Sequence, residues 1–147
     1  MIDAPCTVSE GARAVGELCE LTTPEQLVVL WMRRWVESEG GRRDVQRDAA
    51  LRFGEHGGLA VDALARFLGA VACHARRPLQ RHGRGCACVG ADEGALAAIV
   101  AAAGRRDGCL LRLIVPPLVA GEGFTAVVAA GLALSDALEP PAPATLH

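Results

Sequence analysis

One short stretch of the chain gathers the residue types that most often bind metals or carry thiol chemistry. Between Cys73 and Cys88 lie three of the six cysteines, two of the four histidines and four arginines. Thiolate sulfur and imidazole nitrogen are ligands that zinc prefers, and a thiol beside cationic side chains is a common setting for a reactive cysteine. The sequence therefore directs attention to residues 73–88, which we call the Cys/His/Arg segment.

Zinc binding is the first chemistry that this spacing suggests. Cys86 and Cys88 are two residues apart in a glycine-flanked loop, and His82 lies four residues before Cys86. Cys73 or His74, at the end of the preceding helix, would complete a tetrahedral set. We therefore expect a structural or sensing zinc site on His82, Cys86 and Cys88, with either Cys73 or His74 as the fourth ligand. The spacing is less specific than a repeated C-x-x-C pair, and the same cysteines could serve only as core or loop thiols.

Thiol chemistry without a metal is the alternative use of the same residues. A Cys86–Cys88 disulfide would close a small strained ring and would be easily reduced, as suits a sensor or switch. Cys86 could also form a thiolate–imidazole pair with His82 or His74, with a nearby carboxylate orienting the ring. No order of residues along the chain is diagnostic of a catalytic triad, so the sequence does not predict an enzyme.

The arginines of the segment form a candidate site for an anion or an acidic partner. They are Arg76, Arg77, Arg81 and Arg84, and the glycines among them would also let backbone amides approach an anion. The alternative is that these arginines are solvated and that some pair with Asp92 and Glu93. The formal net charge of the chain is −2, which gives no general attraction to nucleic acid or to an anionic membrane. Neither is expected as a partner.

Composition and periodicity indicate a small helical protein. The chain has 147 residues, of which 51% are hydrophobic, so it can bury a core without a disulfide or a metal. Apolar residues recur at spacings of three and four between Gly and Pro signals. We predict an all-α fold, a compact bundle of about five to seven helices. One helical domain is expected over residues 1–138, followed by a Pro/Ala-rich tail over residues 139–147.

Start and stop signals place the individual helices. Helices are expected over residues 9–20, 23–39, 44–53, 59–75, 92–104, 109–115 and 123–138, with a loop over residues 79–90. Thr23 is the expected N-cap of the second helix, and Gly40-Gly41 its end. On that helix Trp31 and Trp35 should anchor the core, while Arg33 should lie on the polar side. Cys19 and Cys109 are expected to be buried within helices.

The sequence also bears on location and partners. The first residues lack a basic stretch followed by an apolar one, and the apolar runs are shorter than the roughly 20 residues that span a bilayer. These features predict a cytoplasmic protein with free or metal-bound thiols. A protein partner or a second copy of the chain is the expected binding partner.

Two parts of the chain carry a resemblance to known proteins. Residues 23–27 with residues 33–35, and residues 76–79 with residues 85–86 and 92–93, resemble segments of small all-helical proteins of proteobacterial type. The resemblance covers most of the chain and implies one helical domain, with a special place for residues 76–93. It implies no activity.

These observations lead to one functional expectation and two alternatives. We expect a small helical regulatory or adaptor protein that acts by binding through residues 76–93, with a zinc site in the Cys/His/Arg segment. The first alternative is a thiol-based redox sensor or enzyme that uses Cys86 and Cys88. The second is a helical subunit of a larger complex or homo-oligomer that needs no metal.

Overall fold

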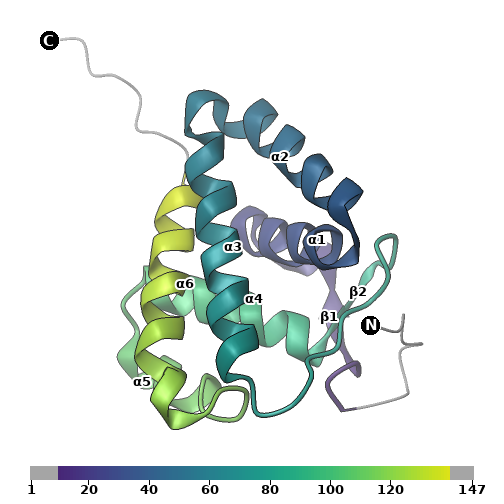
Figure 1. Cartoon of the computed structure of the whole chain (residues 1–147). Coiled ribbons are helices and arrows are strands. Elements are labelled where there is room, and N and C mark those ends of the chain that lie inside the picture. The colour runs from purple at the N-terminus through teal and green to yellow at the C-terminus, as the bar shows by residue number, and fades with distance from the viewer. Residues whose placement is uncertain (1–9, 140–147) are drawn as a thin grey trace, which may run out of the picture.

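The computed structural model describes residues 10–139, and helices form most of this part of the chain (Figure 1). The α-helices are α1 (Thr23–Glu37), α2 (Glu39–Phe53), α3 (Gly57–His74), α4 (Ala91–Gly104), α5 (Gly108–Ile114) and α6 (Phe124–Leu138). Short 3-10 helices are η1 (Leu18–Glu20), η2 (Gly54–His56) and η3 (Gly121–Gly123). Two strands, β1 (Ala14–Glu17) and β2 (Cys88–Gly90), pair antiparallel. The predicted compact helical fold is confirmed, with a small sheet in addition.

The sheet replaces the helix that was predicted over residues 9–20. β1 pairs with β2 so that Ala14 lies opposite Gly90 and Glu17 opposite Cys88. Gly11 and Gly16 lower the helix propensity of this segment, and its strand partner lies about 70 residues further along the chain. A pairing between such distant segments is not visible in local periodicity. The small sheet fixes the end of the Cys/His/Arg segment.

The corner between α1 and α2 also differs from the prediction. Ser38, with φ −172° and ψ 169°, separates the two helices, and its hydroxyl accepts a hydrogen bond from the Gly41 amide at 3.0 Å. Ser38 is therefore the N-cap of α2, and Gly41 lies inside the first turn of that helix. A side chain at position 41 would collide with the backbone carbonyl of Arg34. At the other end of α1 the N-cap is Thr22, one residue before the predicted Thr23.

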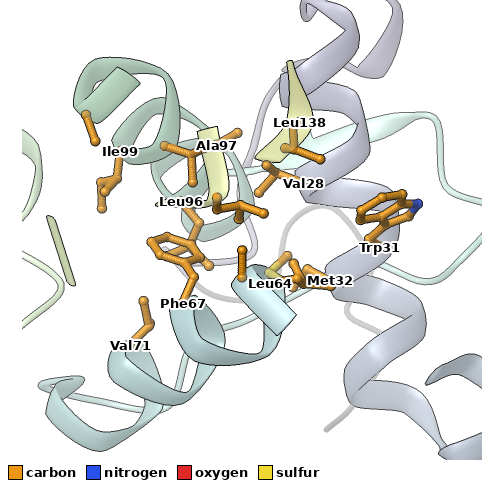
Figure 2. Packing of buried hydrophobic residues seen from close by; sticks show 14 of the residues in the cluster. Val28, Trp31, Met32, Leu64, Phe67, Val71, Leu96, Ala97, Ile99 and Leu138 are labelled. Carbon is orange, nitrogen blue, oxygen red and sulfur yellow. The ribbon is translucent and has the colours of Figure 1, made fainter. Parts of the chain in front are cut away.

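The core lies where α1, α3, α4 and α6 meet. α3 and α6 run side by side and α4 crosses behind them (Figure 1). Figure 2 shows Leu64 and Phe67 of α3 facing Leu96 of α4. Trp31 of α1 is buried, as predicted, and meets the Phe53 ring edge-on at a centroid distance of 6.2 Å.

Some residues that were expected to be buried are not. Cys19 lies in η1 and is exposed, because the helix that would have buried it does not form. Cys109 is also exposed, because Leu111 is the buried residue of the short helix α5. Trp35 is only partly buried, and the Arg42 guanidinium lies 5.1 Å from the centre of its ring. Cys6 and most of the predicted tail lie outside the described residues.

Two helical stretches are long and apolar enough, by length and composition alone, to cross a membrane. They are Glu39–His74, which includes α2 and α3, and Gly121–Leu138, which includes α6. Core helices of soluble proteins meet the same criterion. α3 and α6 also supply buried residues to the shared core, among them Phe67 and Leu134.

Candidate functional site

The Cys/His/Arg segment crosses from the end of α3 to the start of α4 and passes α1 on the way (Figure 1). Pro78 prevents α3 from continuing, and the segment rejoins regular structure only at β2. Three successive backbone carbonyls at the end of the segment accept hydrogen bonds from two neighbouring parts of the chain. The carbonyls of Cys86 and Cys88 accept hydrogen bonds from one partner, Arg33, while the carbonyl of Ala87 accepts one from the Leu18 amide at 2.8 Å.

His82 and Cys86 form the chemical centre of this segment. The His82 ring is fully buried, and its Nε2 lies 2.6 Å from the carbonyl oxygen of Ala12. A carbonyl oxygen only accepts hydrogen bonds, so Nε2 carries a proton. The other ring nitrogen, Nδ1, lies 3.4 Å from the Cys86 sulfur. Nδ1 is therefore the basic nitrogen of the neutral ring and faces a thiol whose proton it can take.

The electrostatics of this pair favour the charged form. Burial would raise the pKa of the Cys86 thiol, but hydrogen bonds from His82 and from the backbone and side chain of Cys88, with the charge of His82, outweigh it and lower the pKa. Burial would lower the pKa of His82, but its bonds to Ala12 and Cys86 and the charges of Glu93 and Cys86 raise it. Both shifts favour a thiolate beside an imidazolium. Cys86 and Cys88 are half-buried, so small reagents can reach them.

A buried ion pair supports the backbone of the two cysteines. Arg33 and Glu93 are both fully buried, and Arg33 Nε donates to Glu93 Oε2 at 2.6 Å. The Arg33 guanidinium also donates to the carbonyl oxygens of Cys86 and Cys88, each at 2.7 Å. Glu93 in turn accepts from the Gly90 amide at 3.0 Å. The prediction that Arg33 lies on a polar face is therefore wrong.

Sequence reasoning missed the role of Arg33, although one signal was available. Residues 27–32 are apolar without interruption, so this part of α1 has no polar face. Arg33 follows the fully buried Val29 by four residues and so lies on the same side of the helix. The partner, Glu93, is 60 residues away, and only the fold brings the two together.

The predicted arginine patch is divided among different partners. Arg77 makes a two-pronged ion pair with Asp92, at 2.8 and 2.9 Å. Arg84 bonds to Glu37 at 3.0 Å and to Asp44 at 3.2 Å. Arg81 is nearly buried, whereas Arg76 is exposed and its Nε donates to the carbonyl of Pro116 at 2.6 Å. The sequence offered the alternative that some of these arginines pair with Asp92, and Arg77 does so.

The structure separates the five predicted zinc ligands. His82, Cys86 and Cys88 lie near one another, but Nε2 of His82 is engaged by Ala12. Cys73 is exposed, and the His74 side chain lies beside Gly123, where a Cβ would collide with it. Over residues 10–139 no group of three or more His, Cys, Asp or Glu side chains is arranged to hold a metal ion. Zinc binding stays a prediction.

A groove adjoins the first part of the segment. It has a volume of about 540 Å³. It is bounded by α1, α3, residues 75–81 and Leu96 of α4. Its walls are mainly apolar, with Met32, Leu68, Val71, Leu79 and Leu96 among them. Arg76, Arg77, Gln80 and Arg81 lie at the same groove. Sequence reasoning found the arginines but not the apolar hollow, because its walls come from separate elements.

Comparison of the chain with protein-family models, with curated proteins and with solved structures gives no significant match. The function is therefore argued from the geometry of the site.

Proposed function

We propose that this protein is a small regulatory protein whose activity is set by the oxidation state of Cys86 and Cys88. One observation carries the proposal: Cys86 faces the basic nitrogen of His82, whose other nitrogen is fixed by a main-chain carbonyl. A thiolate is the reactive form of cysteine, so this arrangement favours attack by Cys86 on an oxidised sulfur compound at neutral pH. Cys88 supplies the second thiol. This proposal develops the redox alternative rather than the zinc site.

The chemistry is thiol–disulfide exchange with a small disulfide, RSSR. The Cys86 thiolate attacks one sulfur, forming a Cys86–SR mixed disulfide and releasing RS⁻. The Cys88 thiol then loses its proton and attacks the Cys86 sulfur, forming the Cys86–Cys88 disulfide and releasing a second RS⁻. Two protein thiols are oxidised and one RSSR is reduced to two RSH. A dithiol reverses the change.

The surrounding contacts give this oxidation a structural consequence. Two residues of extended chain span about 6.6 Å, close to the upper limit of about 6.8 Å between the Cα atoms of a disulfide. Disulfides most often have Cα atoms about 5.5–6 Å apart, so closing the ring at that geometry would shorten the backbone between Cys86 and Cys88. Both carbonyls are bonded to Arg33, so contraction would loosen the contact between this segment and the buried Arg33–Glu93 pair. The reduced and oxidised forms would differ in how firmly residues 82–90 are held.

The proposal predicts which thiol reacts first in the full-length protein. Cys19 is exposed, but hydrogen bonding to Glu17 raises the pKa of its thiol. Under limiting iodoacetamide at pH 7, Cys86 should be alkylated before Cys19 although it is less exposed, as read by peptide mass spectrometry. The pH at which its rate is half-maximal should lie below that of an ordinary thiol. His82→Gln should move that pH upward.

A second measurement tests closure of the disulfide. The variant used keeps Cys86 and Cys88 and has serine in place of the other cysteines. Its reaction with the aromatic disulfide dithiobis(nitrobenzoate) should release two nitrothiobenzoate thiolates per chain and leave no label on the protein. Adding Cys88→Ser should give one released thiolate and one retained label. Slow reaction of Cys86 at pH 7, or retention of two labels when both cysteines are present, would contradict the proposal.

A further inference from the structure

We infer that the groove beside the Cys/His/Arg segment binds a medium-chain carboxylate, with its hydrocarbon chain in the groove and its carboxylate on Arg76. The inference does not depend on the redox proposal, because it rests on a different surface and on other residues. The groove volume of about 540 Å³ falls within the roughly 300–1,000 Å³ typical of small-molecule sites.

The walls of the groove suit a flexible apolar chain. Met32 and Val36 of α1 form one side, and Leu68 and Val71 of α3 form the other, with Leu79 supplied by the Cys/His/Arg segment. Met32 is an adaptable side chain that can fit an irregular ligand. Burying a hydrocarbon chain against these residues removes apolar surface from water on both partners.

The charge at the groove selects an anion. No Asp or Glu is among the described residues that line it, whereas three arginines are. Arg77 is committed to Asp92 through both of its terminal nitrogens. Arg76 uses only Nε, for Pro116, and makes no ion pair with any carboxylate in residues 10–139. Its two terminal nitrogens are left to bind a carboxylate, which guanidinium groups recognise with paired hydrogen bonds.

The test uses the full-length protein and sodium decanoate below its micelle concentration. Calorimetry should give saturable binding, and methyl NMR should place the largest shifts on Leu68, Val71 and Leu79. Arg76→Gln should weaken decanoate binding by about tenfold, because the glutamine amide carries no charge and can replace only one of the two hydrogen bonds. Ala72→Leu, a helix-compatible change at an exposed position that lines the groove, should abolish binding by filling it.

Matched controls separate this site from general apolar adsorption. Arg43→Gln, on the exposed surface of α2, should leave decanoate affinity unchanged. Decan-1-ol should bind more weakly than decanoate and with equal affinity to the wild type and to Arg76→Gln. Equal affinities of decanol and decanoate for the wild type, or shifts spread away from the groove, would overturn the inference. So would binding of an acidic amphipathic peptide in the groove with no binding of decanoate.

Discussion

At the scale of single residues, the site depends on a charged side chain in the interior. The Arg33 guanidinium donates hydrogen bonds to the Glu93 carboxylate and to the carbonyls of Cys86 and Cys88. This one side chain therefore holds the start of α4 and the end of the Cys/His/Arg segment to α1. The sequence showed the type and spacing of the cysteines and of His82. It could not show this pair, because the attraction between Arg33 and Glu93 depends on burial and on contacts across 60 residues.

Replacing Arg33 with Met should be strongly destabilising. The change removes one partner of a buried ion pair and leaves the Glu93 charge without compensation, which typically costs about 3–5 kcal/mol. We expect the free energy of unfolding in urea to fall by that amount. Adding Glu93→Gln should recover part of the loss, because the amide can still accept from Gly90 and carries no charge.

The matched control for Arg33→Met is Arg43→Met on the exposed face of α2, which should change stability by no more than about 0.5 kcal/mol. Equal stability of Arg33→Met and the wild type would show that the buried pair makes no net contribution. In that case other contacts would have to hold the Cys/His/Arg segment in place.

At the scale of elements, the sequence located most helices and missed what joins them. Periodic apolar residues and Gly or Pro breaks gave α3, α4, α5 and α6 nearly to their ends. The misplaced elements are those whose structure depends on a distant partner. β1 forms because β2 is available to pair with it. α2 begins at Glu39, directly after its N-cap Ser38, because Gly41 allows close contact with α1. Local propensity carries no signal for either contact.

The contact between Gly90 of β2 and the His82 ring allows a test of how the sheet positions His82 beside the Cys86 thiol. Gly90 lies against the imidazole, and an added Cβ would be 2.9 Å from both Cδ2 and Nε2 of His82. Gly90→Ala should displace the ring from Ala12 and Cys86. The pKa of the Cys86 thiol should then rise towards its ordinary value, measured by the pH dependence of its alkylation rate.

The control for Gly90→Ala is Gly85→Ala in the same segment. An added Cβ at position 85 has nothing within 4 Å, so this variant should keep the wild-type alkylation profile. If Gly90→Ala also kept that profile while remaining folded, the position of His82 would not control the thiol.

At the scale of the whole molecule, composition and periodicity were enough to predict a compact helical fold. They were not enough to predict the site, because its parts come from the turn before β1, from α1 and α4, and from the segment between α3 and β2. The same limit applies to the apolar groove, whose opposite walls belong to α1 and α3. Sites assembled from distant segments become visible only when the packing is known.

The stability of the whole fold should depend on pH through Asp48, which joins α2 to α1. Asp48 Oδ2 accepts from Trp31 Nε1 at 2.7 Å and from Arg52 Nε at 2.9 Å. Partial burial would raise the pKa of Asp48, but these hydrogen bonds and the charges of Arg52 and Arg34 outweigh it and lower the pKa below 3.8. A carboxylate whose pKa is lowered by folding stabilises the folded state above its unfolded pKa. That contribution is lost as pH falls through the folded pKa.

Asp48→Asn isolates this contribution, because the amide still offers an oxygen to Trp31 but carries no charge. At pH 7 the wild type should have the larger free energy of unfolding, measured by far-ultraviolet circular dichroism in urea. The difference should shrink as pH falls below 3.8 and vanish below the folded pKa of Asp48. Asp62→Asn, on the exposed surface of α3, serves as the matched control for loss of a carboxylate. A difference that stayed constant from pH 7 to pH 2 would show that the charge of Asp48 does not stabilise the fold.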